Sequence, residues 1–127
     1  MVVKSNGIVA VRLREKDIEL VRKWRNSSFN LKYMNYQKQI CKDMQKKWFM
    51  EIDNFNNFYF VINRNGINTG VANIKNIDWS RKTGEVGVLI SDQKLIGDST
   101  NILVALTMCD FCFKILGMNY VTSIVRT

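Results

Sequence analysis

Residues 92–101, with the sequence DQKLIGDSTN, lie between two apolar runs and have a composition that could bind an anion. The segment contains Gly97 and ends in four residue types that commonly start helices, namely Asp98, Ser99, Thr100 and Asn101. Backbone N–H groups in the first turn of a helix lack intrahelical acceptors and can hold a phosphate. An ordinary capped turn between a strand and a helix has the same composition, so this segment alone favours that simpler interpretation.

The chain contains no histidine among its 127 residues. Histidine-based acid–base catalysis, Ser-His and Cys-His triads and histidine-ligated metals are therefore excluded. Proton transfer must use Glu, Asp, Tyr, Cys, Lys or water. The spacing of Cys109 and Cys112 suits a redox or zinc pair, but this pair lies within an apolar helical run and has no second pair. We therefore interpret both cysteines as core residues and expect no metal.

The formal charge is +8, and most of it lies in one segment. Between Arg12 and Lys47 there are eleven Lys and Arg against four Asp and Glu, a difference of +7. Such a segment suits a polyanionic ligand, either a nucleotide cofactor or nucleic acid, although a solvated basic face explains it equally well. A nucleic-acid module would use Lys42, Lys46 and Lys47 with Trp48, but we consider it the less favoured class.

The cellular location follows from cysteine usage and hydropathy. Three cysteines, an odd number, argue against a disulfide framework and for a reducing cytoplasm. No stretch approaches the roughly 20 apolar residues that a membrane span needs. The first residues lack the apolar core of a secretory leader. We therefore expect a cytoplasmic protein without a membrane partner.

The first half of the chain predicts a strand, two helices and a hairpin. VAVRLREKD alternates apolar and charged residues, which is typical of a half-buried strand. Asp17 then caps a helix with an inner face that we expect to contain Ile18, Val21 and Trp24. A second amphipathic helix follows, and the turn NRNG separates two strands. The predicted inner face of this second helix is Ile40, Met44, Trp48 and Ile52.

The second half predicts a strand in TGEVGVLIS, a helix over residues 101–116 ended by Gly117, and a strand in NYVTSIV. The whole is one α/β (α+β) domain. Its mixed, mostly antiparallel sheet ends in a parallel β-α-β crossover, with helices on both faces. The helix has a narrow polar stripe, so we expect it to be buried on nearly every side. That stripe is Asn101, Thr107, Asp110 and Lys114.

This order of elements, with the segment from GEVGVLIS to FKILG, resembles the GCN5-related N-acetyltransferase superfamily. FKILG matches the end of the helix in the family's acetyl-CoA signature, whereas the glycine loop departs from the pattern Q/R-x-x-G-x-G/A. Counting back from FKILG places Ile96 at the Q/R position, with Ser99 and Asn101 at the small residues. The fold and acetyl transfer from acetyl-CoA follow from the resemblance, while the register of the loop stays open.

The resemblance also implies how acetyl-CoA binds. Pantetheine would pair with the strand at Val88, Leu89, Ile90 and Ser91, where a backbone N–H would polarise the thioester carbonyl. The pyrophosphate would lie on the amides of Ile96, Gly97, Asp98, Ser99, Thr100 and Asn101. Glu85 shares a strand face with Gly87 and Leu89, and is our candidate for the base that takes the proton of the amine.

Within the superfamily, KWRNSSFNLKYM, WFMEI and FYFVI resemble the UDP-4-amino-sugar N-acetyltransferases of pseudaminic acid biosynthesis. The resemblance implies that Arg25, Met34 and Phe49 contact a nucleotide-linked amino sugar. Met34 and Phe49 could instead be core residues, and Arg25 an ordinary ion-pair donor. N-terminal amines of peptides or ribosomal proteins are the alternative acceptors, and an inactive acyl-CoA-binding fragment is a third possibility.

Members of this superfamily continue past the strand that matches NYVTSIV with a further helix and strands. We therefore expect a C-terminally shortened chain in which an apolar edge at residues 120–125 lacks its neighbour. A second copy would cover this edge in a homodimer. The shortened form would have weak activity or none.

Overall fold

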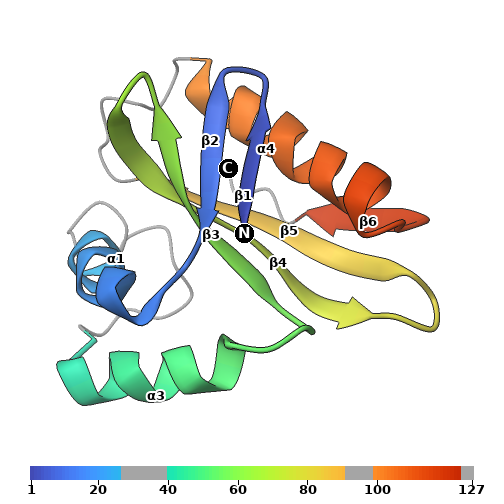
Figure 1. The fold of residues 1–127 in the computed structure, drawn as a ribbon. Helices are drawn as coiled ribbons and strands as arrows, with labels where there is room; N and C mark the ends of the chain where they lie inside the picture. Colours follow the sequence, from blue (N-terminus) through green and yellow to red (C-terminus); the bar gives the residue numbers. More distant parts are fainter. Residues whose placement is uncertain (27–39, 91–98, 124–127) are drawn as a thin grey trace.

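The computed structural model describes residues 1–26, 40–90 and 99–123. They form a twisted six-stranded sheet in the order β1-β2-β3-β4-β5-β6, with α1 and α3 on one face and α4 on the other (Figure 1). The strands are β1 (Val2–Ser5), β2 (Ile8–Arg12), β3 (Phe58–Arg64), β4 (Ile67–Asp78), β5 (Thr83–Ile90) and β6 (Tyr120–Ser123). The helices are α1 (Ile18–Arg25), α3 (Lys42–Ile52) and α4 (Thr100–Asp110), and a π-helical turn (Phe111–Ile115) extends α4.

Neighbouring strands pair antiparallel from β1 to β5, and β5 pairs with β6 in parallel, which confirms the predicted crossover. The β3–β4 turn has Asn65 and Gly66 at φ 54° and 81°, the left-handed conformations that a tight Asn-Gly hairpin needs. Strand β1 was not predicted. Its turn to β2 uses the same pair, Asn6 and Gly7, at φ 55° and 74°. The signal was therefore present in the sequence KSNG.

The larger core lies between the sheet and α4. Phe111 packs edge-on against Phe58 and Phe60, with ring centroids 5.4 and 5.2 Å apart. Both Phe111 and Cys112 are fully buried in the π-helical turn. The helix ends at Gly117, which has φ +67°, and the backbone N–H of Met118 donates to the carbonyl of Cys112 at 2.9 Å. The predicted glycine C-cap is confirmed.

The smaller core lies under α1 and α3. Ile18, Val21 and Trp24 are all buried there, as the spacing predicted. The predicted cap is wrong: the side chain of Asp17 makes no capping bond to α1. Its carboxylate instead accepts hydrogen bonds from the backbone N–H and the Nε of Arg14, both at 3.1 Å. A charged partner three residues earlier in the chain competes with the amides of the helix for this carboxylate.

The buried face of α3 is turned by one residue from the prediction. Met44 is 40% exposed, whereas Gln45 is fully buried. The buried amide is compatible with this position because both of its ends are hydrogen-bonded. Its Nε2 donates to the carbonyl of Ile18 at 2.9 Å, and its Oε1 accepts from Arg25 at 3.2 Å. Ile40 is buried, and Trp48 and Ile52 are half-buried, as predicted.

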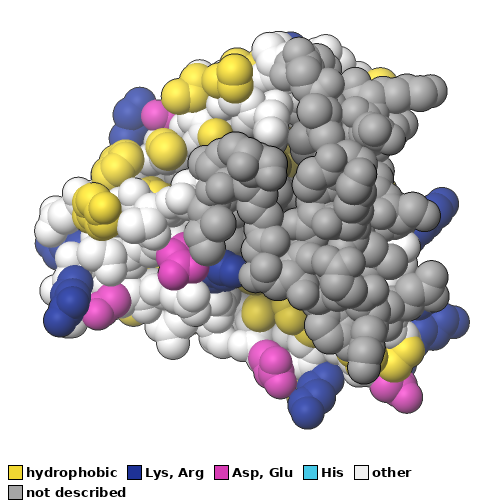
Figure 2. Space-filling view, turned by 180° about the vertical axis from the view of Figure 1, so that it is seen from behind, with side chains coloured by type: hydrophobic (Ala, Val, Ile, Leu, Met, Phe, Trp, Pro, Cys, Tyr) yellow, Lys and Arg dark blue, Asp and Glu magenta, His cyan; other side chains and the backbone are white. Residues whose placement is uncertain are grey.

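Helix α4 is not buried on nearly every side. Its outer side and the π-helical turn expose apolar side chains, and Figure 2 shows hydrophobic groups gathered over this region at the upper left. The exposed residues are Ile102, Leu106, Phe113 and Ile115. Only one side of the helix contacts the sheet, so an almost uniformly apolar sequence does not require all-round burial within one chain. Among the described residues, no helix is long and apolar enough to cross a membrane.

We predict that Gln45→Leu lowers the free energy of unfolding by about 1–3 kcal/mol, the cost of leaving a buried polar partner unsatisfied. The partner is the half-buried guanidinium of Arg25. Met44→Leu, a change at the neighbouring exposed position, should alter stability little. Urea unfolding of both variants checks this, and equal effects at the two positions would contradict the observed burial of α3.

Candidate functional site

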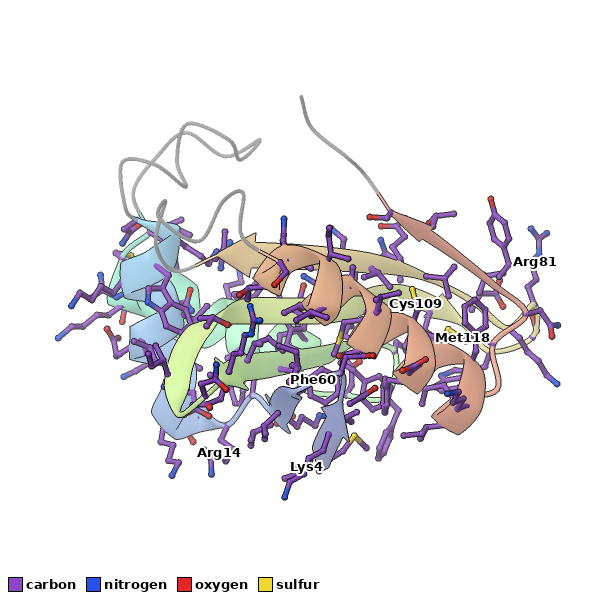
Figure 3. All side chains as sticks on the ribbon, turned by 90° about the horizontal axis from the view of Figure 1, so that it is seen from above. Lys4, Arg14, Phe60, Arg81, Cys109 and Met118 are labelled. Carbon is purple, nitrogen blue, oxygen red and sulfur yellow. The ribbon has the colours of Figure 1, made fainter. Side chains whose placement is uncertain are left out.

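Strand β5 contributes to both faces of the sheet. Val86 belongs to the core under α4, and a Cβ on Gly84 would lie 3.1–3.3 Å from Ile74 and Met118 on that same face (Figure 3 labels Met118). Leu89 packs in the smaller core under α1 and α3. Because side chains alternate along a strand, Glu85 and Gly87 share the face of Leu89, as predicted.

The two neighbours of β5 pair with different lengths of it. Pairing with β4 continues to Ile90, opposite Gly70, whereas the described pairing with β6 stops at Val86, opposite Ser123. From Gly87 to Ile90 the described residues give the β6-facing edge of β5 no strand partner. Backbone N–H and C=O groups on such an edge can pair with an extended ligand.

A β-bulge in β4 positions Asn76 so that it donates a hydrogen bond to Glu85. The β4–β5 register shifts between Lys75 and Asp78, and Asn76 there adopts a positive φ of 52°. Its Nδ2 donates to the carboxylate of Glu85 at 3.2 Å. Bulges re-aim single side chains, and this one directs an amide at the only carboxylate that the described residues of β5 contain.

Glu85 is half-buried and borders an open hollow of about 320 Å³ at the end of the sheet. Arg81, which Figure 3 labels at the β4–β5 turn, lies on its rim. The remaining lining is mostly polar and comes from β4, β5 and β6, namely Asn76, Thr83, Gly84, Tyr120 and Thr122. A small polar molecule could therefore reach the carboxylate from solvent.

A polar row crosses the α1/α3 face next to Glu85. By register, Asn73 on β4 lies between Tyr59 on β3 and Gly87 on β5. A Cβ on Gly87 would lie 3.0 Å from Oδ1 and 3.2 Å from Nδ2 of Asn73, so the carboxamide occupies the space over this glycine. The Oδ1 is buried and has no hydrogen-bond partner among the described residues.

At the other end of this row, Arg25 lies over the ring of Trp48, which in turn packs against Tyr59. Its guanidinium carbon lies 4.9 Å from the ring centroid of Trp48, and Trp48 packs edge-on against Tyr59 at 5.1 Å. Burial lowers the pKa of Arg25, partly offset by Tyr59. Burial raises the pKa of Tyr59, although Arg25 acts in the opposite direction. Tyr59 is therefore a neutral phenol at physiological pH, and the guanidinium remains charged.

Of the other two predicted acceptor contacts, the structure describes Phe49 but not Met34. Phe49 is half-buried against the smaller core, beside Trp48 and Leu89, so it lies on the same side as Arg25. Met34 lies outside the described residues. Arg25 and Phe49 thus share one side of the molecule with Glu85, and their contact with an acceptor stays a prediction.

The start of α4 lies beside the end of β5. A small crevice is lined by Val88 and Leu89 of β5 together with Thr100 and Asn101 of α4. Arg64 Nη1 donates to Thr100 Oγ1 at 2.6 Å, which places a guanidinium at the helix N-terminus. Ser99 precedes the helix without a side-chain cap. Ser91, Ile96, Gly97 and Asp98 lie outside the described residues, so the described part of the predicted phosphate loop is Ser99, Thr100 and Asn101.

Cys112 is a core residue, as predicted, whereas Cys109 is only half-buried. Cys112 is fully buried, and burial, together with Cys109, raises its pKa to about 12. A thiol with that pKa stays protonated and unreactive at neutral pH. Figure 3 labels Cys109 on α4. Among the described residues, no group of three His, Cys, Asp or Glu is placed to hold a metal ion.

The model of the acetyltransferase (GNAT) domain matches residues 8–127, and the chain belongs to this family. Its members transfer an acetyl group from acetyl-CoA, and the predicted fold class and enzyme class are thereby confirmed. No curated protein sequence matches the chain.

Solved structures agree on the fold. A spermidine N-acetyltransferase chimera from Vibrio cholerae and hSSAT has a TM-score of 0.77 at 17% identity, covering 88% of this chain and 66% of its own. The Vibrio cholerae spermidine N-acetyltransferase in complex with CoA and spermine gives 0.76 at 14% identity, with coverages of 90% and 68%. A GNAT-family acetyltransferase from Bacillus anthracis gives 0.74 at 17%, with 97% and 72%. The present chain therefore spans about two thirds of the first two.

Three polar residues of the site were not predicted from the sequence, namely Tyr59, Asn73 and Asn76. Asn73 and Asn76 lie within the segment GVANIKNID, where an asparagine inside a strand has low propensity and was a usable signal. Tyr59 alternates with apolar residues and gave no signal of its own. The bulge that turns Asn76 toward Glu85 depends on the β4–β5 register, which the sequence does not specify.

Proposed function

We propose that this chain acetylates a primary amine on a nucleotide-linked amino sugar, with acetyl-CoA as the donor. The observation that carries the choice of acceptor is the stacking of Arg25 on Trp48 beside Tyr59, on the face that also contains Glu85. A guanidinium held by aromatic rings suits a diphosphate and a nucleobase.

The acetyl donor would bind along β5. Its pantetheine arm would pair with the backbone of Val88, Leu89, Ile90 and Ser91, where an N–H could polarise the thioester carbonyl. Its pyrophosphate would lie on the amides of residues 96–101, at the start of α4.

The reaction needs a neutral amine. Its nitrogen attacks the carbonyl carbon of the thioester, a C–N bond forms and the C–S bond breaks. The sulfur leaves as the thiolate of CoA, and the amine transfers one proton to Glu85 directly or through water. Asn76 would hold the carboxylate in place through its 3.2 Å hydrogen bond.

The charge of the acceptor distinguishes a nucleotide-linked sugar, which is anionic, from a polyamine, which is cationic. A polyamine is the acceptor named for one of the Vibrio cholerae structures. A polyamine carries several ammonium groups and needs several carboxylates. The described row around Asn73 offers one carboxylate, Glu85, and one guanidinium, Arg25, and the segment 12–47 is strongly basic. An anionic acceptor therefore suits the site better. The structural similarity keeps polyamines as the second candidate, and N-terminal amines of peptides are a third.

We also propose a homodimer through the edge of β6, the last strand in the sheet order. Tyr120 on this strand is 61% exposed, and the neighbouring α4 exposes an apolar side. A second copy could pair with the edge and cover this surface. Sedimentation velocity should show a dimer at micromolar concentration, and a monomer at every concentration tested would contradict it.

We predict turnover of UDP-linked amino sugars and much weaker turnover of spermidine, spermine and N-terminal peptides. Release of free thiol from acetyl-CoA measures each reaction, with no-acceptor and no-enzyme samples as controls. Robust acetylation of spermidine without any acetylation of UDP-amino sugars would replace the first candidate by the second. Arg25→Gln should weaken the nucleotide-linked acceptor selectively, because its diphosphate loses a cationic partner.

We predict that Glu85→Gln lowers kcat by about 100-fold, since general-base catalysis typically contributes at least that much. The effect should be larger below the pKa of the acceptor amine, where less of the amine is neutral. Glu51→Gln, at an exposed position on α3, is the matched control and should leave kcat unchanged. A pH–rate profile of all three proteins measures the difference, and an unchanged rate in Glu85→Gln would remove this residue from the mechanism.

A further inference from the structure

Among the described residues, the carboxamide of Asn73 has a buried oxygen whose hydrogen bonding is incomplete. Its Oδ1 is shielded from solvent and has no partner among the described residues. Leaving a buried acceptor unsatisfied destabilises a fold, and such groups are rare enough in native structures to require an explanation. Gln45 provides the contrast, because it is fully buried on the same side of the sheet and both ends of its amide are bonded.

The position of Asn73 points to the explanation. Its amide lies over Gly87, with Oδ1 3.0 Å from the point where a side chain would begin. Gly87 follows Val86, which ends the described pairing with β6, and it is two residues from Glu85 on the same face. The unsatisfied oxygen therefore lies over Gly87, between Glu85 and the stretch of β5 that we assign to the acetyl donor, where the acceptor amine has to meet the thioester.

We propose that Asn73 Oδ1 accepts a hydrogen bond from the N–H of the acceptor amine and orients its lone pair toward the thioester. An amine keeps an N–H to donate whether or not it has lost its ammonium proton, so the contact serves binding and attack alike. The terminal torsion of an asparagine is soft, which lets the amide turn to meet the ligand. This inference rests on the proposed acetylation of an amine and adds the group that positions it, whichever molecule carries that amine.

Gly87 leaves the space that the carboxamide of Asn73 occupies. A side chain at this position would lie within 3.0–3.4 Å of all three outer atoms of the carboxamide, closer than ordinary contacts. The glycine thus keeps space for the amide over β5. Gly87→Ala should displace the carboxamide and weaken acceptor binding in the same direction as loss of Asn73.

The test is Asn73→Leu, measured for stability and for steady-state kinetics. Removing an unsatisfied buried polar group should keep or raise Tm. The value of kcat/KM for the acceptor should fall about tenfold or more, as expected for loss of a hydrogen bond to a reacting group. The KM for acetyl-CoA should stay within twofold. Asn73→Asp, which retains an acceptor oxygen at this place, should preserve most of the acceptor affinity.

Asn68→Leu, an exposed asparagine on the same strand, is the matched control and should change neither quantity. If Asn73→Leu lowers Tm while acceptor kinetics stay unchanged, Asn73 is a structural residue and the proposal is overturned. The same conclusion follows if Asn73→Leu fails to fold and Asn73→Ser keeps full activity.

A readout apart from turnover separates this proposal from the choice of acceptor. In the CoA complex, the side-chain NH2 signals of Asn73 should shift when a non-reactive alcohol or acetylated analogue of the acceptor is added. If no member of the acceptor panel is acetylated, the nucleotide-sugar proposal fails, while a rise in Tm of Asn73→Leu still supports an unsatisfied site. A fall in Tm of Asn73→Leu together with unchanged NH2 signals on addition of the analogue would overturn the Asn73 proposal without any measurement of turnover.

Discussion

The backbone of β5 has to satisfy hydrogen bonds on two sides with partners of unequal length, and the rest of the molecule depends on this constraint. On the β4 side it pairs from Thr83 to Ile90, and on the β6 side the described pairs end at Val86. Polar backbone groups cannot remain buried without partners, and Gly87 to Ile90 have none on the β6 side within the described part of the chain, so an extended ligand could pair there. The antiparallel pairing with β4 anchors the other side of β5 up to Ile90. The crossover through α4 places the described pairs of β6 along the first half of β5.

The two β-bulges of β4 both lie beside residues that contact β5. One register shift occurs between Ile62 and Asn63 of β3, opposite the segment of β4 that contains Gly70, and the other lies between Lys75 and Asp78. Gly70 pairs with Ile90 and lines the crevice at the start of α4, while Asn76 holds Glu85. Each bulge disrupts the ladder locally and re-aims side chains. The irregularities of β4 thus lie beside the two ends of the stretch of β5 that we assign to the donor and to the base.

Much of the fold followed from local signals. The NRNG turn, the glycine after FKILG and the inner face Ile18, Val21 and Trp24 each depend on one segment, and the structure contains them as predicted. The predictions failed where a side-chain partner that apolar periodicity does not reveal determines the structure. Asp17 bonds Arg14 instead of the helix amides, and Gln45 replaces Met44 in the interior because Arg25 and the carbonyl of Ile18 satisfy it.

In the candidate site, too, the features that depend on one segment were predicted, whereas those that depend on several strands were not. Glu85 shares its face with Gly87 because strand alternation is local, and the placement of α4 beside the end of β5 followed from the family pattern. The row from Tyr59 through Asn73 to Gly87 could not be predicted, since it requires the register of three strands. The phosphate loop stays a prediction beyond Ser99, Thr100 and Asn101, because its other residues lie outside the described part of the chain.

The side-chain amides of Gln45 and Asn73 lie on the same side of the sheet but differ in how their hydrogen bonds are satisfied. Gln45 has both ends bonded within the protein, so it fixes the contact between α1 and α3. Asn73 is only half-buried as a residue, but its Oδ1 is shielded from solvent without a partner among the described residues, and the amide lies over Gly87. A strand position flanked by apolar residues would favour a leucine or valine for stability alone. The unsatisfied amide is therefore most simply explained by a hydrogen bond that forms only when a ligand donates it, and the stability lost in the free protein is recovered on binding.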